Sequence, residues 1–375
     1  MELREWRRLA IQSVALLAVV LVSCLGFSRQ MQGQPDAGVQ AEDRRRSAGE
    51  HVVARQDKKE VPTAATKALV EERSDTYMKI PKEKITSASG VYLQNNYIDF
   101  EVMLTFQGVE SGCIHAGDIL RVRGYQVNTG KISKDDAVFD KIEVADKGIS
   151  DSERNEIQIK FTLKRAYEPI LFEAEDAYYI SLLSARRAHE KIVVIDAGHG
   201  GMDEGTMSVN KKHYEKDYVL YIQDKLSKLL DKTDITVYYT RTTDEQVTKK
   251  DRVRLANALQ ADLFVSIHCN ALQGGVNTEG VETLYSKRKP KYGNVTNREL
   301  AELMLDRVTE STGRKKRAAI VREGLYLMRC SKVPTTIVEV GYMTNQGDMN
   351  FMKKEIGQQK IAEGIYQSII EAMQK

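Results

Sequence analysis

The C-terminal half of the chain contains two histidines and two glutamates whose types and positions fit one chemical site. His199 stands among three glycines in "VVIDAGHGG", directly after an apolar run. His268 ends the apolar stretch "DLFVSIH", Glu339 lies inside "TTIVEVGY", and Glu215 begins the amphipathic segment "EKDYVLYIQDKL". Two imidazoles and one carboxylate are a typical donor set for a catalytic Zn²⁺, which keeps its fourth position open. The glycines around His199 allow a sharp turn and leave space near the metal.

Glu339 is more informative than the other three residues when each is taken singly. A histidine at a strand end is often structural, and a glutamate in the first turn of a helix often only complements the helix dipole. Glu339, in contrast, lies between Val338 and Val340, where a carboxylate is costly to bury unless it is paired or has a shifted pKa. Such groups concentrate at functional sites, so we interpret Glu339 as a functional residue.

The elements that must position these residues follow from the alternation of apolar patterns after Lys191. Apolar strand-like stretches begin at residues 192, 235, 262, 280 and 335, and helical stripes lie at 219–230, 300–308 and 361–373. This alternation predicts an α/β domain with a mainly parallel sheet flanked by helices. Because ligand sites in open α/β sheets gather outside the carboxyl ends of the strands, we expect His199, His268 and Glu339 at one edge.

Three further features of this domain are candidates for roles near the site. Asn270, two residues after His268, is a candidate for orienting substrate or a metal-bound group, and Asp196 for orienting a ligating histidine. The segment "SKRKPKYGN" at 286–294 either meets anionic substrate groups or is a solvated basic loop. Cys269 adjoins His268, but adjacent residues on a strand point to opposite faces, so we do not expect a catalytic pair.

Residues 86–184 show the period of two that is typical of half-buried strands, most clearly at 98–106, where every second residue is apolar. We expect a small all-β, sandwich-like domain. His115 is the one histidine of this range and has no partner at metal-ligand spacing, so the sequence gives this domain no catalytic constellation. It acts either as a binding module or as a structural spacer.

The first 85 residues are typical of an export and anchoring region. Arg4, Arg7 and Arg8 precede an apolar run at 9–27, and residues 28–85 read as a polar linker. The run is long enough to span a bilayer, and the preceding charges place residues 1–8 in the cytoplasm. We therefore expect a single-pass membrane protein whose domains at 86–184 and 185–375 lie outside the cytoplasm. Two alternatives remain open, a cleaved secretory signal and a lipoprotein modified at Cys24.

The composition excludes two classes of protein. A net charge of +3 with 29% charged residues gives no global basic field, so we expect no nucleic-acid partner. Besides Cys24 there are only three cysteines, Cys113, Cys269 and Cys330, which are too few for a disulfide scaffold in an exported body of this size.

Four segments of the C-terminal domain carry a family resemblance. In order they are "IVVIDAGHGGMDEGT", "YEKDYVLYIQDKL", "YYTRTTDEQVTKKDRVRLANALQADLFVSIHCNA" and "PTTIVEVGYMTNQGD". They resemble the blocks of zinc-dependent N-acetylmuramoyl-L-alanine amidases, the bacterial cell-wall hydrolases, over about residues 191–372. Two positions depart from the family pattern: Cys269 replaces a common alanine, and "KKRAAIVRE" at 315–323 differs from the usual glycine-bearing segment.

The resemblance implies the roles of individual residues. His199, Glu215 and His268 would be the ligands of one Zn²⁺ per catalytic domain, and Glu339 the catalytic carboxylate. Peptidoglycan would be the substrate, cut between the lactyl group of N-acetylmuramic acid and L-alanine. The membrane expected from the apolar run at 9–27 would then be that of a bacterium. Two other functions fit the same residues, a zinc peptidase acting within the stem peptide and a catalytically silent wall-binding protein. Whether a protein activator exists is left open.

Overall fold

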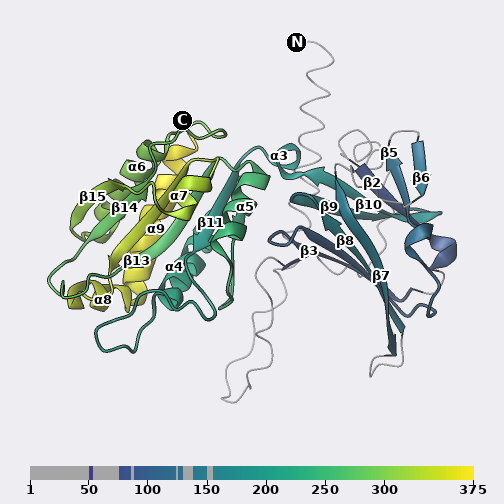
Figure 1. Ribbon diagram of the computed structural model, residues 1–375, viewed down its shortest axis with the longest axis horizontal. Coiled ribbons are helices and arrows are strands. Elements are labelled where there is room, and N and C mark those ends of the chain that lie inside the picture. The colour runs from purple at the N-terminus through teal and green to yellow at the C-terminus, as the bar shows by residue number, and fades with distance from the viewer. Residues whose placement is uncertain (1–49, 54–75, 86–87, 124–125, 130–137, 150–154) are drawn as a thin grey trace, which may run out of the picture. The chain divides into compact units, whose positions relative to one another are not determined.

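The computed structural model describes residues 50–53, 76–85, 88–123, 126–129, 138–149 and 155–375. Within this part of the chain, two antiparallel sheets form before residue 185 and one mixed sheet forms after residue 191 (Figure 1). The expected membrane-spanning run at 9–27, with Cys24, lies outside the described residues. Among the residues that are described, no helix combines the length and apolar character needed to cross a membrane.

The β-rich part consists of two five-stranded sheets with the orders β1-β3-β4-β8-β7 and β6-β5-β2-β10-β9. Alternate residues of β8 are buried, as the period of two predicts. Met78 and Ile80 on β2 are also buried, so the β-rich part extends into the range expected as linker. The elements are β1 (Glu50–Val53), β2 (Thr76–Pro81), η1 (Lys82–Lys84), β3 (Gly90–Asn96), β4 (Glu101–Gln107), η2 (Ala116–Asp118), β5 (Leu120–Arg123), β6 (Gln126–Thr129), β7 (Phe139–Ile149), β8 (Asn155–Leu163), β9 (Tyr167–Glu173) and β10 (Ala177–Ser184).

The third sheet has the order β12-β11-β13-β16-β14-β15. Its strands are β11 (Ile192–Ala197), β12 (Thr236–Tyr239), β13 (Leu263–Asn270), β14 (Val281–Tyr285), β15 (Lys316–Val321) and β16 (Thr335–Tyr342). β11, β12, β13 and β16 are parallel, as expected. β14 runs antiparallel to β16, and β15 is parallel to β14, so the sheet is mixed rather than uniformly parallel.

Helices cover both faces of this sheet. Val193 and Ile195 of β11 pack in the hydrophobic cluster that includes α4 and α9, whereas Ile192 and Val194 pack in the cluster that includes Val253 of α5. The strand is apolar at consecutive positions because both of its faces are buried. The helices are α3 (Ala185–Ala188), α4 (Glu215–Leu230), α5 (Lys249–Leu259), α6 (Asn297–Thr312), α7 (Tyr326–Cys330), α8 (Gln346–Met352) and α9 (Glu355–Ala372).

The direction of β14 decides which loops lie at which edge of the sheet. We call the edge at which β11, β13 and β16 end the carboxyl edge. β14 begins there, because Glu282 pairs with Glu339, and the loop that follows β14 therefore lies at the opposite edge. The amide of Lys291 in that loop donates to the carbonyl of Lys332, just before β16 begins, at 2.6 Å. The basic segment at 286–294 is thus remote from the carboxyl edge and is a solvated loop.

Candidate metal centre

His199 lies two residues beyond β11 in a backbone conformation that few non-glycine residues adopt. Its φ is 60°, and the glycines at 200–201 have φ values of 124° and 59°. Nδ1 of its ring lies 2.8 Å from Oδ1 of Asp203, and its Nε2 lies 3.2 Å from Oε2 of Glu215. The turn therefore points the imidazole at the first residue of α4, while Asp203 fixes the ring orientation.

Two buried arginines hold the backbone of this turn. Arg241 donates from Nε to the carbonyl of Ala197 and from Nη2 to that of Gly198, each at 2.8 Å. Arg252 donates to the carbonyls of Ala197 and His199 at 2.8 and 2.6 Å. Arg241 is 0% exposed and Arg252 4% exposed, so water does not compete for these hydrogen bonds. The position of His199 is therefore set by side chains from beyond its own loop.

Glu215 is the first residue of α4, and only 1% of its surface is exposed. Its Oε2 accepts a hydrogen bond from the amide of Thr206 at 2.7 Å, and its Oε1 from the amide of Cys269 at 2.9 Å. Backbone donors from two separate segments thus orient both carboxylate oxygens. The early position in the helix also suits a negative charge.

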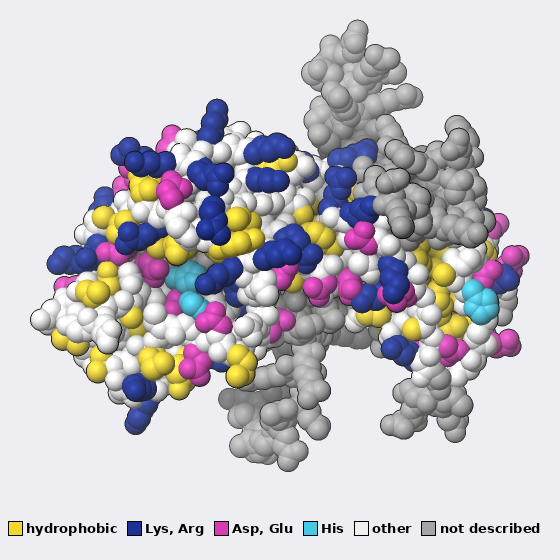
Figure 2. All heavy atoms as spheres, viewed as in Figure 1, with side chains coloured by type: hydrophobic (Ala, Val, Ile, Leu, Met, Phe, Trp, Pro, Cys, Tyr) yellow, Lys and Arg dark blue, Asp and Glu magenta, His cyan; other side chains and the backbone are white. Residues whose placement is uncertain are grey.

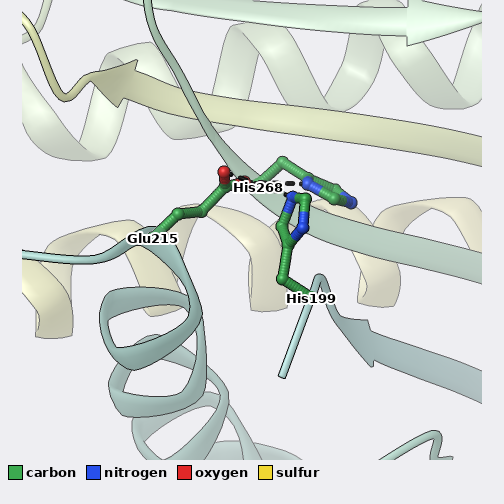
Figure 3. A group of neighbouring side chains, drawn as sticks. All are labelled: His199, Glu215 and His268. Atoms are coloured by element: carbon green, nitrogen blue, oxygen red, sulfur yellow. Dashed lines mark hydrogen bonds and ion pairs between the residues drawn. The ribbon is translucent and has the colours of Figure 1, made fainter. Parts of the chain in front are cut away.

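The two histidines and Glu215 converge from three elements (Figure 3). Nδ1 of His268, near the end of β13, lies 2.8 Å from Oε1 of Glu215. The two imidazole rings are 4.9 Å apart and nearly perpendicular, at 83°. One donor atom from each of His199, Glu215 and His268 lies within 4.8 Å of the others. The structure thus brings together the three residues that the resemblance assigns to zinc, in a donor set that suits this metal.

Two glycines make this convergence sterically feasible. A Cβ atom at Gly198 would lie 2.3 Å from Cε1 of His268. A Cβ atom at Gly205, whose φ is 70°, would lie 2.6 Å from Oε2 of Glu215 and 2.7 Å from Cδ2 of His199. Any larger residue would displace a donor. The glycines thus provide room for the donor side chains themselves, whereas the sequence analysis expected them to allow a sharp turn and leave space near the metal.

The charges of the donors also suit a cation. Burial favours the neutral form of Glu215, but hydrogen bonds from His199 and His268 outweigh it and lower the pKa of Glu215. Burial would lower the pKa of His268, but the hydrogen bond and the charge of Glu215 raise it to about 8. The buried carboxylate thus favours positive charge in its surroundings. A divalent cation held by the same atoms would supply that charge and replace the proton of the imidazole.

Glu339 lies beside the metal donors, because β13 and β16 pair His268 with Glu339 in register. Its Oε2 atom is buried and has no hydrogen-bond partner among the described residues. Burial raises the pKa of Glu339 to about 7. A buried polar atom without a partner needs an explanation, and a water molecule or substrate at the metal centre provides one.

Asp196 is placed differently from its sequence-based interpretation. It accepts hydrogen bonds from Thr240 at 2.5 Å and Ser266 at 2.6 Å, and it pairs with Arg252. It is therefore not the hydrogen-bond partner of a ligating histidine; Asp203 has that position at His199. The influence of Asp196 on the site is indirect, through Arg252. Asp203 was missed because its role depends on the turn at 199–201, which the sequence pattern does not specify.

Asn270 is engaged with protein groups. Its Nδ2 donates to Oε2 of Glu282 at 3.1 Å, and its Oδ1 accepts a hydrogen bond from the amide of Ala271 at 2.8 Å. Glu282 is 7% exposed and also pairs with Arg317. Neither Glu282 nor Arg317 was predicted from the sequence as a residue of the site. Glu282 carried the same signal as Glu339, a carboxylate in an apolar strand, in "GVETLYS".

Cys269 points away from the metal donors, as expected for a neighbour of His268 on a strand. Its Sγ lies 3.8 Å from Sδ of Met352, the last residue of α8. Burial raises the pKa of its thiol well above the ordinary value, which keeps it protonated. Cys269 therefore packs in the core between the sheet and α8.

The fold and this site define an α/β protein with a metal-donor group and an unpartnered glutamate at the carboxyl edge of its sheet. The family model for N-acetylmuramoyl-L-alanine amidase matches residues 193–371, and the chain belongs to this family. The matched residues coincide with the α/β domain, so the family membership applies to this part of the chain.

Among curated proteins, the chain is 33% identical over 179 residues to YqiI of Bacillus subtilis, described as uncharacterized, and covers 83% of it. It is 32% identical over 176 residues to the probable cell wall amidase LytH of Staphylococcus aureus. That match spans 47% of this chain and 56% of LytH, about half of each protein.

Among solved structures, an N-acetylmuramoyl-L-alanine amidase of Clostridium difficile 630 is 34% identical, with a TM-score of 0.46 over 49% of this chain and 97% of that one. The catalytic domain of CwlV from Bacillus (Paenibacillus) polymyxa is 31% identical, with a TM-score of 0.45 over 49% of this chain and 98% of that one.

Proposed function

We propose that the protein is a zinc-dependent N-acetylmuramoyl-L-alanine amidase. The bond cut is the amide between the lactyl group of N-acetylmuramic acid and L-alanine of the peptidoglycan stem peptide. The observation that carries the proposal is the convergence of His199, Glu215 and His268 beside Glu339, whose Oε2 has no partner among the described residues. Family membership supports the choice of peptidoglycan as the substrate class.

The three donors would hold one Zn²⁺ and leave a coordination position open. When bound, Zn²⁺ would supply Lewis-acid chemistry for polarising the scissile carbonyl and for lowering the pKa of water. The chain supplies the remaining functions. Arg241, Arg252 and Asp203 hold His199 in place, and the amides of Thr206 and Cys269 orient Glu215.

Glu339 is the proton carrier in this proposal. Its Oε2 atom accepts a proton from the attacking water and then donates it to the nitrogen of the leaving L-alanine. Burial, which raises the pKa of Glu339, makes its carboxylate a better proton acceptor than an exposed glutamate.

Product analysis separates this proposal from its alternatives. Purified sacculi are digested with the zinc-loaded protein and the soluble fraction is examined by mass spectrometry. Intact stem peptides free of sugar support the amidase, whereas shortened peptides still attached to sugar support a peptidase. If a folded, zinc-containing protein releases no product from the sacculi, this result supports a wall-binding role. Removal of zinc with a chelator should abolish release, and addition of Zn²⁺ should restore it.

A single-pass membrane location is a separate proposal, which rests on the apolar run at 9–27 and the arginines before it. Extraction of membranes at high pH should leave the protein in the pellet, and protease added to spheroplasts should digest its domains. Recovery of a shortened chain in the medium would favour a cleaved signal. Loss of lipid labelling in a Cys24→Ser variant would favour the lipoprotein.

A further inference from the structure

A row of polar side chains continues from the metal centre across the sheet. His268 of β13 pairs with Glu339 of β16, and Glu339 pairs with Glu282 of β14. Directly paired residues of adjacent strands project on the same face of a sheet. His268, Glu339 and Glu282 therefore form a line that leads away from the metal donors toward β15.

A bulge brings Arg317 of β15 into this row. The register passes from Val281 opposite Lys316 to Thr283 opposite Ala319, so two residues of β15 face Glu282 alone. Bulges next to active sites re-aim side chains, and here Nε of Arg317 donates to Oε1 of Glu282. Since Asn270 donates to the other carboxylate oxygen, Glu282 is held from both sides.

The outer part of the Arg317 side chain retains donor capacity. Nη1 lies 3.5 Å from the carbonyl oxygen of Glu279, at the limit of hydrogen bonding. The guanidinium carbon lies 5.4 Å from the centre of the Tyr342 ring, and the side chain is 31% exposed. The guanidinium is anchored through Nε and also interacts with the side chain of Tyr342. Its remaining terminal N–H groups are available to a carboxylate.

Charged side chains are exposed on both sides of the metal donors. On the β11 side, the loop after His199 exposes the carboxylates of Asp203 and Glu204. On the β15 side, Arg317 and Lys315 are exposed. Figure 2 shows histidine side chains at the surface, with acidic and basic side chains close to them. The exposed cations on the β15 side favour an anionic group there.

We propose that Arg317, anchored by Glu282, forms a subsite for the free α-carboxylate of the stem-peptide residue that follows L-alanine. The subsite deepens the proposed amidase function and rests on it. Strands are about 4.8 Å apart, so β15 lies about 10 Å from β16. An extended peptide advances about 3.5 Å per residue, which places the second residue after the scissile bond about 7 Å away, within reach of an arginine side chain.

The test compares two small substrates that differ in one group. MurNAc-L-Ala-D-Glu carries a free α-carboxylate, and MurNAc-L-Ala-D-isoGln carries an amide in its place. Both substrates keep a free γ-carboxylate, so the comparison measures the contribution of the α-carboxylate alone. The zinc-loaded wild type should hydrolyse the acid with a kcat/KM about 10- to 100-fold higher than the amide, the range for hydrogen bonds to a charged group. Arg317→Gln should lose this preference, mainly through KM for the acid; the ratio of the two kcat/KM values is the measure, because the substitution also removes the ion-pair partner of Glu282. Arg317→Lys should keep part of the preference, because it retains the charge without the fork.

A matched control and a binding measurement complete the test. Lys289→Gln removes an exposed cation at the opposite edge of the same sheet and should leave the acid-to-amide ratio unchanged. Calorimetry with L-Ala-D-Glu and L-Ala-D-isoGln measures binding at the subsite without turnover, on the full chain.

Equal binding of these dipeptides to the wild type, or an unchanged acid-to-amide ratio in Arg317→Gln, would overturn the subsite. If Arg317→Gln does not fold, the subsite is tested by the acid-to-amide ratio of kcat/KM in the wild type and in Arg317→Lys. If the wild type cleaves neither muramyl peptide, the amidase proposal fails, and dipeptide binding still decides the subsite.

Discussion

Glu339 is the residue whose proposed role is separable from metal binding. Its carboxylate is paired in register with His268 but is not one of the three grouped donors. We expect Glu339→Gln and Glu339→Ala to retain one zinc per chain and to lower turnover of peptidoglycan by about 10²- to 10⁴-fold, as the loss of a general acid-base predicts. Elemental analysis of zinc and dye release from labelled sacculi measure the two properties. Wall-lytic activity at the wild-type rate in either variant would exclude Glu339 as the proton carrier.

Gly198 connects residue chemistry with the geometry of the turn after β11. Gly198→Ala places a Cβ atom 2.3 Å from the ring of His268, so the ring must move. We expect zinc affinity to fall about 10- to 100-fold, as for other changes that disturb the orientation of a metal ligand. Competition with a chromophoric chelator measures this affinity. Gly324→Ala is the control, since a Cβ there meets no atom within 4 Å. Equal zinc affinities of the two variants would contradict the proposed crowding.

At the scale of elements, the ion pair of Asp196 and Arg252 links β11 to α5. The two side chains are 1% and 5% exposed. Arg252→Met leaves the carboxylate of Asp196 buried without its charge partner, which costs about 3–5 kcal/mol of the free energy of unfolding. Urea unfolding followed by circular dichroism measures this loss. Lys228→Met breaks the exposed pair with Asp224 and should have little effect. Similar losses in the free energy of unfolding of the two variants would show that the buried ion pair stabilises the protein no more than the exposed one.

Elements at the carboxyl edge were predictable where a residue ends or interrupts a recognisable apolar strand. This is how His199, His268 and Glu339 could be placed together from the sequence. The reversal of β14 was not predicted, since "GVETLYS" is equally apolar in either direction. The length of the connection did indicate the reversal. Residues 271–280, between β13 and β14, contain no helix and are too few for a parallel crossover, which needs a dozen or more residues.

Other contacts of the site depend on features that residue patterns do not encode. Arg317 reaches Glu282 because of a bulge, and Asp203 reaches His199 because three successive residues have positive φ. The boundary of the β-rich part was missed for a different reason. β2 has only a short alternation, with Met78 and Ile80 buried inside a polar stretch, so it resembled the linker that precedes it.

At the scale of the whole molecule, chemistry is confined to one part of the chain. Within the described ranges, the one group of metal-donor side chains is His199, Glu215 and His268, and every residue assigned to the site lies after residue 184. We expect a fragment of residues 185–375 to hydrolyse MurNAc-L-Ala-D-Glu with the kcat/KM of the full chain, since domains of this size can fold alone. A large loss on this soluble substrate would show that the β-rich part contributes to catalysis.

The same fragment tests the role of the β-rich part on a polymeric substrate. If that part is a binding module, the fragment should digest whole sacculi more slowly than the full chain while its rate on the small substrate is unchanged. If it is a spacer, both rates should match those of the full chain. Sedimentation of the fragment and of the full chain with sacculi gives an independent measure of binding.

The reversed direction of β14 has a practical consequence for handling this protein. Lys287, Lys289 and Lys291 are exposed in a loop at the edge of the sheet opposite His199 and Glu339. Coupling to a solid support through these lysines would orient the immobilised molecules with their carboxyl edge outward. Insoluble material applied to such a surface would then meet the side of the sheet that holds the metal donors.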